Sequence, residues 1–251
     1  CFGCGAGGDV IYIIFGVVYL DYISAVEFLA KRAGIALPDF SDGGRIEGGV
    51  SRTRVLQMNK EAARFFRKML FDDTVGTAAR MYLIGERMLD SSVVKHFGIG
   101  YSPKNSYSLR DHLQSLGFKY EELVVGYLCG KSERGYYDYF RGRVMFPLID
   151  VSGNIVAFGG RVLDGSKPKY LNTSDTPAFK KSKNLFALNY AKNSDEETLI
   201  ICEGYMDVIA LHAAGFTNSV ATLGTAITPE HARIIKRYAK KAILAYDGDE
   251  A

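Results

Sequence analysis

Residues 198–246 alternate apolar strands with helices, and this rhythm constrains the fold more than any other feature of the sequence. The predicted elements are a strand at 198–202, a helix at 205–214, a strand at 219–223, a helix running from the N-cap Thr228 to about residue 239, and a strand at 242–246. A β-α-β-α-β order predicts a parallel sheet with right-handed crossovers. Ligands of such sheets bind at the carboxyl ends of the strands.

Acidic residues follow two of these predicted strands. Glu203 comes directly after the first strand, and Asp247 and Asp249 come after the third. In extended backbone, residues i and i+2 point the same way, so Asp247 and Asp249 can face one ion. A hard cation such as Mg²⁺ prefers oxygen ligands and relieves the repulsion between carboxylates. The alternative is that these acids cap the next helix or face water.

The composition excludes several classes of protein. The apolar run Ile11–Leu20 has ten residues, whereas a membrane-spanning helix needs about 20. No secretory signal opens the sequence, and 47% hydrophobic residues exclude a disordered chain. We therefore expect a cytoplasmic protein without a membrane segment. The chain begins without methionine and stops in mid-pattern at DGDEA, so we expect a fragment lacking both ends.

Charge is distributed unevenly along the chain. Residues 1–130 are nearly neutral, with 15 basic and 14 acidic side chains, whereas residues 131–192 carry 11 basic and 5 acidic ones. Residues 193–251 carry 5 basic and 9 acidic side chains. A basic block beside an acidic block suits phosphate binding next to cation binding, although clustering on a solvated surface explains it equally well.

The preceding residues fall into three predicted segments. A capping box at Ser24–Glu27 opens a helix that Gly34 ends, and the glycine-rich stretch 38–50 reads as an exposed linker. Residues 59–125 have a helical pattern, with helices starting at Ser91 and Ser108 and Gly117 ending the latter. Residues 143–162 change to a β-hairpin whose turn carries Gly153.

The stretches LIICEGYMDVIAL, SVATLGTAIT and AILAYDGDEA resemble the Toprim domain that topoisomerases and primases share. YFRGRVMFPLID, IVAFGGRVL, PKYLN, CFGCG and AVEFLAKRAGI are similar specifically to the bacterial replicative DNA primases. The resemblance implies an α/β fold in which a helical and β-hairpin basic subdomain precedes a partial Toprim sheet. It implies these domains: a zinc-domain remnant at 1–36, a linker at 37–58, a basic subdomain at 59–192 and a truncated Toprim subdomain at 193–251.

The resemblance also implies roles for individual residues. Glu203 would be the catalytic acid of the first Toprim motif, and Asp247 and Asp249 would bind Mg²⁺ or Mn²⁺. Asp207 belongs to the same motif, although an acid in the first turn of a helix is also favoured by the helix dipole. The implied reaction is synthesis of short RNA primers on single-stranded DNA from ribonucleoside triphosphates, by two-metal nucleotidyl transfer.

The basic block gains a role from the same resemblance. The basic positions implied to face template or nucleotide are Arg141, Arg143, Arg161, Lys169 and Lys181. Arginine grips phosphate with paired hydrogen bonds, and lysine adds a point charge. Tyr170 and Asn172 lie among them, and the tyrosine either stacks on a base or packs the hairpin.

Cys1 and Cys4 resemble the second half of the zinc site of that family. Zinc needs four ligands in a closed structural site, so in this chain the pair has the alternative of being free thiols. The resemblance further implies a replicative helicase partner, contacted through a C-terminal domain outside this sequence, and we expect a monomer. We expect this fragment alone to be inactive.

Two other functions remain open on the sequence. A Toprim nuclease or topoisomerase would use the same acids for DNA cleavage, although a topoisomerase needs a tyrosine in a separate breakage domain. A non-catalytic nucleic-acid-binding module would carry the acids incidentally. Metal binding separates the catalytic functions from the last one, because salt-dependent binding to nucleic acid is common to all.

Overall fold

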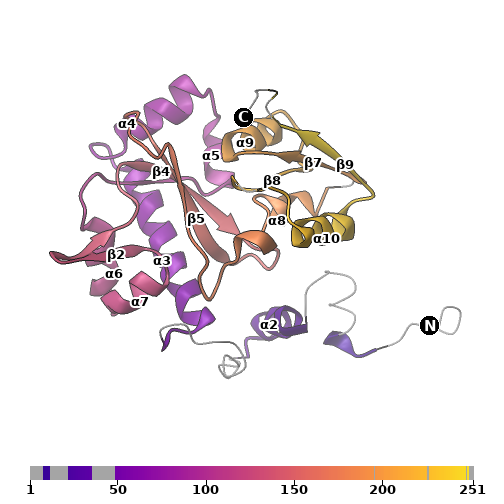
Figure 1. Ribbon diagram of the computed structural model, residues 1–251, viewed down its shortest axis with the longest axis horizontal. Coiled ribbons are helices and arrows are strands. Elements are labelled where there is room, and N and C mark those ends of the chain that lie inside the picture. The colour runs from indigo at the N-terminus through magenta and orange to yellow at the C-terminus, as the bar shows by residue number, and fades with distance from the viewer. Residues whose placement is uncertain are drawn as a thin grey trace, which may run out of the picture. The chain divides into compact units, whose positions relative to one another are not determined.

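The computed structural model describes residues 8–11, 22–35, 49–194, 196–224, 226–246 and 248. The chain divides into two compact units, Cys1–Gly44 and Arg45–Ala251. In the first unit, helix α2 spans Tyr22–Ala33, and Gly34 follows it with a φ of +68°. The helix that the sequence predicts near Ser24 is therefore present. The second unit contains all the strands that the structure describes (Figure 1).

Helix α3, Arg52–Phe71, is the longest helix that the structure describes. It begins seven residues before the predicted start at Asn59, because the Ser51 side chain accepts a hydrogen bond from the backbone N–H of Arg54 at 3.2 Å and caps the helix. Val55 and Met58 extend its buried apolar face toward this cap. The prediction of a linker conformation for residues 52–58 was therefore wrong.

The next stretch is mostly helical. The sequence predicted a helical pattern for all of residues 59–125, and one strand interrupts it. Its elements are α4 Thr77–Arg80, a π-helical turn Met81–Glu86, α5 Ser91–His96, β1 Gly100–Ser102, α6 Ser108–Ser115 and α7 Tyr120–Val125. The predicted helix starts at Ser91 and Ser108 are confirmed, and Gly117 ends the latter with a φ of +86°. Strand β1 is the exception, because Gly100 lets the backbone pack closely on α3: a Cβ there would lie 2.6 Å from Cβ of Phe66.

An antiparallel sheet forms the centre of this unit. Its strands are β4 Arg143–Ile149, β5 Ile155–Val162 and β6 Tyr170–Asn172, and the strand order is β1-β4-β5-β6. The predicted hairpin is confirmed, and Gly153 lies in its turn with a φ of +84°. A separate hairpin, β2 Cys129–Ser132 and β3 Gly135–Asp138, was not predicted.

The two faces of this sheet pack against different partners. Met145 and Phe158 lie in a hydrophobic cluster with α3 residues such as Phe66. Val144 and Phe146 lie in the other cluster, with residues of helix α9. Because directly paired residues share a face, Arg161, which pairs with Val144, lies on the α9 side. We call this the α9 face and the other the α3 face.

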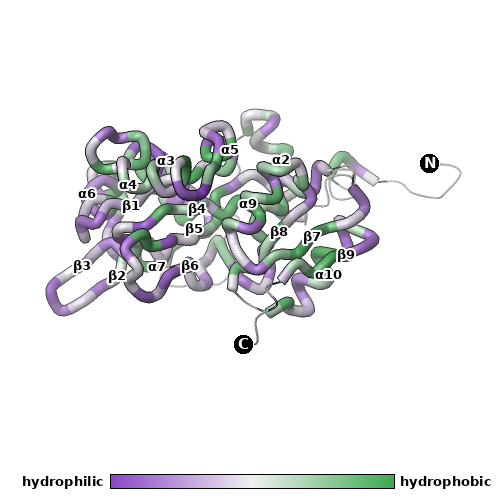
Figure 2. The backbone as a smooth tube through the Cα atoms, turned by 90° about the horizontal axis from the view of Figure 1, so that it is seen from above, coloured by the Kyte–Doolittle hydropathy of each residue, from purple (hydrophilic) through white to green (hydrophobic). Residues whose placement is uncertain are grey.

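The C-terminal elements form a parallel sheet, as the sequence predicted. The elements here are the 3₁₀ turn Lys181–Lys183, α8 Leu188–Ala191, β7 Thr198–Cys202, α9 Tyr205–Ala213, β8 Ser219–Ala221, α10 Pro229–Tyr238 and β9 Lys241–Ala245. The strand order is β8-β7-β9, and both pairings are parallel. Thr228 caps α10 by accepting from the backbone N–H of His231 at 3.1 Å. Along the tube in Figure 2, β7 and β8 are largely apolar.

Tyr205, in the first turn of α9, joins the two sheets. It is buried, and its ring stacks on Phe146 with 5.0 Å between centroids. Its hydroxyl donates to Oδ1 of Asn172 in β6 at 2.8 Å. A Cβ at Gly159 would overlap Cζ and the hydroxyl oxygen of Tyr205, so only glycine admits the ring here. No helix in the described residues has the length and apolar character that crossing a membrane requires.

We predict that Gly159→Ala destabilises the protein by about 1–3 kcal/mol, because the added methyl group overpacks the contact with Tyr205. Urea denaturation measures the free energy of unfolding. Gly85→Ala is the matched control, since nothing lies within 4 Å of a Cβ there and its φ is not positive. Equal stability of the two variants would contradict the tight packing at Gly159.

A second prediction concerns Asp138, whose carboxylate accepts hydrogen bonds from the backbone N–H groups of Leu109 and Arg110 at 2.8 Å each. Burial raises the pKa of Asp138 to about 6. The native state therefore holds this proton more tightly than the unfolded chain, so the contribution of Asp138 to stability is largest below about pH 4 and is lost as the pH rises through about 6.

Asp138→Asn removes this titration. We expect the difference in free energy of unfolding, wild type minus variant, to fall by up to about 3 kcal/mol between about pH 4 and pH 7. Urea denaturation over this pH range measures it. A difference that stays constant with pH would show that Asp138 does not titrate in this way.

Candidate functional site

The carboxyl ends of β7 and β9 meet at one edge of the parallel sheet. Cys202 pairs with Ala245, so the residues that follow them, Glu203 and Tyr246, leave the sheet side by side. The Glu203 side chain is exposed and makes no hydrogen bond or ion pair with the residues that the structure describes. It is therefore a carboxylate available to a ligand.

Asp207 lies one helical turn beyond Glu203, in the first turn of α9. Its Oδ2 accepts a hydrogen bond from the backbone N–H of Gly204 at 3.1 Å, which caps the helix. The side chain is exposed. Capping thus occupies Oδ2 and leaves Oδ1 without a hydrogen bond to the described residues.

Asp247 and Asp249 lie outside the described residues. In the part of the chain that is described, no group of three or more His, Cys, Asp or Glu side chains is placed to hold a metal ion. Glu203 and Asp207 suit a hard divalent cation chemically, because both offer exposed carboxylate oxygens at a strand end. Cys1 and Cys4 also lie outside the described residues.

Arg161 points from β5 onto the α9 face. Its Cζ lies 4.3 Å from the ring centroid of Tyr82 and 5.9 Å from that of Tyr170. Its Nε and Nη1 are buried and have no hydrogen-bond partner among the described residues. A buried guanidinium nitrogen without a partner is costly, so Arg161 suits an anionic ligand.

Arg87 and Tyr82 belong to the same cluster, and the sequence analysis missed both. Nε of Arg87 donates to the hydroxyl oxygen of Tyr82 at 2.7 Å. The two residues are brought into line by the π-helical turn, in which the backbone N–H of Arg87 bonds the carbonyl of Tyr82, five residues back, at 2.9 Å. An ordinary helical pattern pairs residues three or four apart, so no pattern in the sequence predicts this contact.

Tyr170 connects the basic cluster with the acidic edge. Burial raises the pKa of Tyr170, the positive charges of Arg161 and Arg87 lower it, and the negative charge of Asp207 raises it. Both sets of charges are thus close enough to act on one phenol. Asn172, two residues on, accepts from Tyr205 and donates from Nδ2 to the carbonyl of Leu223 at 3.0 Å.

Arg143 lies on the α3 face, away from Arg161. It is 7% exposed, and Nη1 donates to the carbonyls of Gly160 at 3.1 Å and Pro168 at 3.1 Å. Burial lowers its pKa. Its described contacts therefore hold together β5 and the segment before β6. Lys169, at the end of that segment, is exposed.

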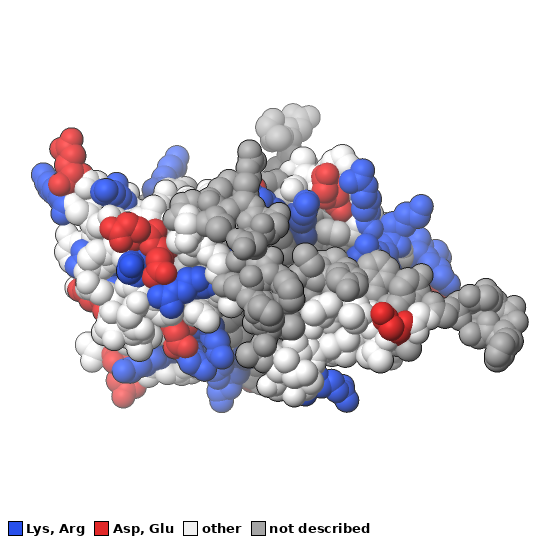
Figure 3. All heavy atoms as spheres, turned by 90° about the horizontal axis from the view of Figure 1, so that it is seen from below, with Lys and Arg blue, Asp and Glu red and all other residues white. Residues whose placement is uncertain are grey.

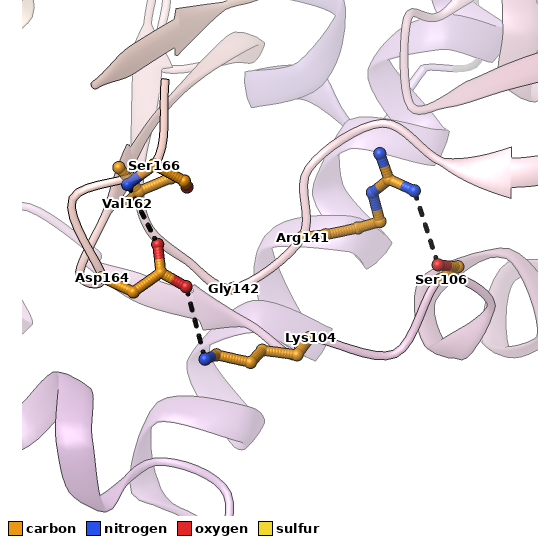
Figure 4. Close-up of a pocket in the computed structure, with 7 residues that line it drawn as sticks. All are labelled: Lys104, Ser106, Arg141, Gly142, Val162, Asp164 and Ser166. Carbon is orange, nitrogen blue, oxygen red and sulfur yellow. Dashed lines mark hydrogen bonds and ion pairs between the residues drawn. The ribbon is translucent and has the colours of Figure 1, made fainter. Parts of the chain in front are cut away.

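Arg141 lines a hollow of about 250 Å³ beside the sheet (Figure 4). Nη1 of Arg141 donates to Oγ of Ser106 at 3.4 Å, and its Cζ lies 5.2 Å from the ring centroid of Tyr137. Across the hollow, Nζ of Lys104 pairs with Asp164 at 3.3 Å. The hollow is polar and has charges of both signs.

Lys181 lies in the 3₁₀ turn that faces the start of α10. Its backbone carbonyl is bonded at 2.9 Å by Nε2 of His231, a fully buried residue. Its backbone N–H donates to Oδ1 of Asp175 at 3.0 Å. These bonds fix the backbone of the turn, and the Lys181 side chain is half-buried.

The structure thus divides the predicted basic residues into groups. Arg161, Tyr170 and Asn172 lie together on the α9 face near Asp207, whereas Arg143 lies on the α3 face and Arg141 lines the hollow beside Ser106. On the face shown in Figure 3, the described lysine and arginine side chains are interspersed with acidic ones. The α9-face cluster of Tyr82, Arg87, Arg161 and Tyr170 is defined by the contacts of the two arginines with the Tyr82 ring.

Solved structures of DNA primase domains share this fold. The RNA polymerase domain of the primase of Mycobacterium tuberculosis matches with a TM-score of 0.74 at 36% identity, covering 80% of this chain and 68% of that one. A primase catalytic domain bound to single-stranded DNA matches with a TM-score of 0.73 at 35% identity, covering 79% and 62%. The zinc-binding and RNA polymerase domains of the Aquifex aeolicus primase match with a TM-score of 0.71 at 33% identity, covering 100% and 60%. The predicted α/β fold with a Toprim-type parallel sheet is confirmed.

Sequence comparisons agree with the structural ones. The DNA primase of Clostridium acetobutylicum is 40% identical over 252 residues, which cover 100% of this chain and 42% of that protein. The DNA primase of Pseudomonas aeruginosa is 41% identical over 259 residues, covering 100% and 39%. The chain therefore spans about two-fifths of the length of these curated relatives.

Family models divide the chain at the same place as the two sheets. The Toprim domain matches residues 197–251, which hold the parallel sheet. The model described as the N-terminal domain of the DNA primase catalytic core matches residues 65–192, just over half of the chain. The resemblance found in the sequence is thereby confirmed, and the chain belongs to the DNA primase family.

Proposed function

We propose that this chain is the part of a DNA primase that joins ribonucleotides into short RNA primers on single-stranded DNA. One observation carries the proposal: Tyr170 lies between Arg161, whose Cζ is 5.9 Å from its ring centroid, and Tyr205, which stacks on it in the same helical turn as Asp207. Nucleotidyl transfer needs such a meeting of cationic groups, which hold phosphates, with carboxylates, which hold metal ions. Because the chain spans about two-fifths of its relatives, the activity is that of the longer protein.

The acidic edge would hold Mg²⁺ or Mn²⁺ through Glu203, Asp207, Asp247 and Asp249. Glu203 and the free oxygen of Asp207 fit a hard cation, since both are exposed carboxylate oxygens at the end of a buried strand. A cation bound there supplies Lewis-acid stabilisation of the reacting phosphate and its pyrophosphate leaving group. The capping bond to Gly204 orients Asp207 in advance, so both functions of this residue coexist.

The basic residues differ in burial and contacts, and we assign them different roles accordingly. Arg161 and Arg87, which both lie against the ring of Tyr82, suit the phosphates of the incoming ribonucleoside triphosphate. Tyr170 packs between Arg161 and Tyr205, which favours packing over base stacking. Arg141, Lys169 and Lys181 would contact the template backbone. Arg143 would act indirectly, by bracing the strand that carries Arg161 and the segment that carries Lys169.

The remaining partners concern the longer protein. Cys1 and Cys4 would supply two of the four ligands of a structural Zn²⁺. A replicative helicase would bind through a region outside this sequence. We infer a monomer that works in the cytoplasm, in keeping with its proposed task in replication.

We predict that Glu203→Gln lowers ribonucleotide incorporation on single-stranded DNA by about 100-fold or more in the full-length primase, because the amide loses the negative charge that binds the cation. Incorporation of labelled ribonucleotides measures it. Glu61→Gln is the control, since Glu61 forms only a surface pair with Arg64 on α3. Full activity of Glu203→Gln would remove the proposed function.

Metal binding can be tested separately from activity. We expect Mn²⁺ added to the isotope-labelled chain to broaden the amide NMR signals of Glu203, Gly204 and Tyr246, because these residues flank the acidic edge. Signals of the β2–β3 hairpin serve as the reference. Uniform broadening, or none, would contradict a metal site at this edge.

A further inference from the structure

Tyr82 contacts both arginines of the α9-face cluster, through two different parts of its side chain. Its ring lies under Arg161, with 4.3 Å from the guanidinium carbon to the ring centroid. Its hydroxyl oxygen accepts the Nε–H of Arg87 at 2.7 Å. The Cζ of Arg87 lies 5.4 Å from the same centroid. One buried tyrosine therefore fixes where two cations lie relative to each other.

The backbone that follows Tyr82 forms two hydrogen bonds that span more residues than those of an α-helix. The π-type bond from the N–H of Arg87 to the carbonyl of Tyr82 is followed by one from the N–H of Leu89 to the carbonyl of Leu83 at 3.0 Å. Between them, Met88 has a φ of +53°, in the left-handed region that non-glycine residues rarely adopt. Such turns occur frequently at functional sites. This one sets Arg87 over the hydroxyl of Tyr82.

Burial explains why Tyr82 can act as a rigid support. The side chain is 6% exposed and lies in the hydrophobic cluster that includes Val144 and Tyr205. The ring face attracts a guanidinium through its quadrupole, most strongly where water is excluded. The hydroxyl provides the only hydrogen bond described for the Arg87 side chain.

The arrangement is electrostatically incomplete without an anion. Two guanidinium groups against one ring repel each other. The Nε and Nη1 of Arg161 are buried, and no residue in the described part of the chain forms a hydrogen bond with them. No salt bridge to either arginine is present among the described residues, although Asp207 acts on the neighbouring Tyr170. A multiply charged anion such as a polyphosphate would satisfy both cations together.

We propose that Tyr82 is a positioning residue that presents Arg161 and Arg87 together to the polyphosphate of the incoming nucleotide. The inference rests on the proposed function, and it adds the residue that positions the two arginines. The ring orients Arg161, the hydroxyl orients Arg87, and neither part of Tyr82 touches the nucleotide. The two contributions are separable, because Tyr82→Phe removes only the hydroxyl and Tyr82→Leu removes both.

The test measures binding of inorganic tripolyphosphate to the full chain by calorimetry in the absence of divalent metal. We expect Tyr82→Phe to weaken binding about 5- to 10-fold, since one orienting hydrogen bond is lost. Tyr82→Leu should weaken it further. In the full-length primase, Tyr82→Phe should raise the KM for ribonucleoside triphosphates with little change in kcat, because phosphate binding is lost equally in the ground and transition states.

Tyr190→Phe is the matched control. The Tyr190 hydroxyl donates to the backbone carbonyl of His96 at 2.7 Å, and its ring packs against the same hydrophobic cluster without contacting an arginine. Its loss should lower stability about as much as Tyr82→Phe does while leaving tripolyphosphate binding unchanged. A purely structural role of Tyr82 would make the two variants indistinguishable in binding and KM.

Arg161→Gln separates failure of this inference from failure of the proposed function. If Arg161→Gln weakens tripolyphosphate binding but Tyr82→Phe binds like wild type, Tyr82 does not position the arginines and the inference is overturned. If Arg161→Gln also binds like wild type, the phosphate site assigned under the proposed function is itself misplaced.

Discussion

The contact of the Tyr205 ring with the backbone of Gly159 is the interaction on which the rest of the structure depends. Tyr205 begins helix α9, directly after the acidic end of β7, and its hydroxyl reaches Asn172 in β6. The ring can approach the antiparallel sheet this closely only because residue 159 lacks a Cβ. The buried aromatic contact with Phe146 contributes both apolar burial and a fixed orientation. The acidic edge and the basic face are thereby held together.

The resulting site holds exposed carboxylates near a partly buried guanidinium group. Glu203 and Asp207 are exposed carboxylates at a strand end, while Arg161 presents buried nitrogens that form no hydrogen bond with the residues the structure describes. In a structure kept only for stability, such groups would be paired with each other or replaced. Their separation, with Tyr170 between them, suits a ligand that carries both phosphate groups and metal ions. Nucleoside triphosphates with Mg²⁺ are ligands of this kind.

Burial also separates the basic residues by role. Arg143 and Arg161 are similar in sequence context, each at the end of a strand and close to glycine. Arg143 donates to backbone carbonyls and has its pKa lowered by burial, whereas Arg161 has buried nitrogens without a partner among the described residues. Arg143 stabilises the hairpin, and the ligand-binding role that we propose falls to Arg161. Basic residues in one motif therefore need not share one function.

Local patterns in the sequence determined most elements of the fold, and its motifs indicated the family. Apolar spacing and capping residues act within a few positions, so they predicted the β-α-β-α-β unit, the cap at Thr228 and the hairpin turn at Gly153. The acids at the strand ends and the primase motifs could also be recognised in the sequence. The start of α3 was missed, because the apolar face that extends it to Ser51 lies next to a glycine-rich stretch.

The tertiary structure alone decided which side chains meet. A register irregularity between Leu148 and Ile149 sets which residues of β4 and β5 oppose each other, and so sets the faces on which Arg143 and Arg161 lie. The π-helical turn aligns Tyr82 with Arg87, a spacing that no regular helix produces. Local sequence patterns encode which residues are buried within an element, whereas contacts between distant elements depend on packing, register and irregular turns that no short window of sequence contains.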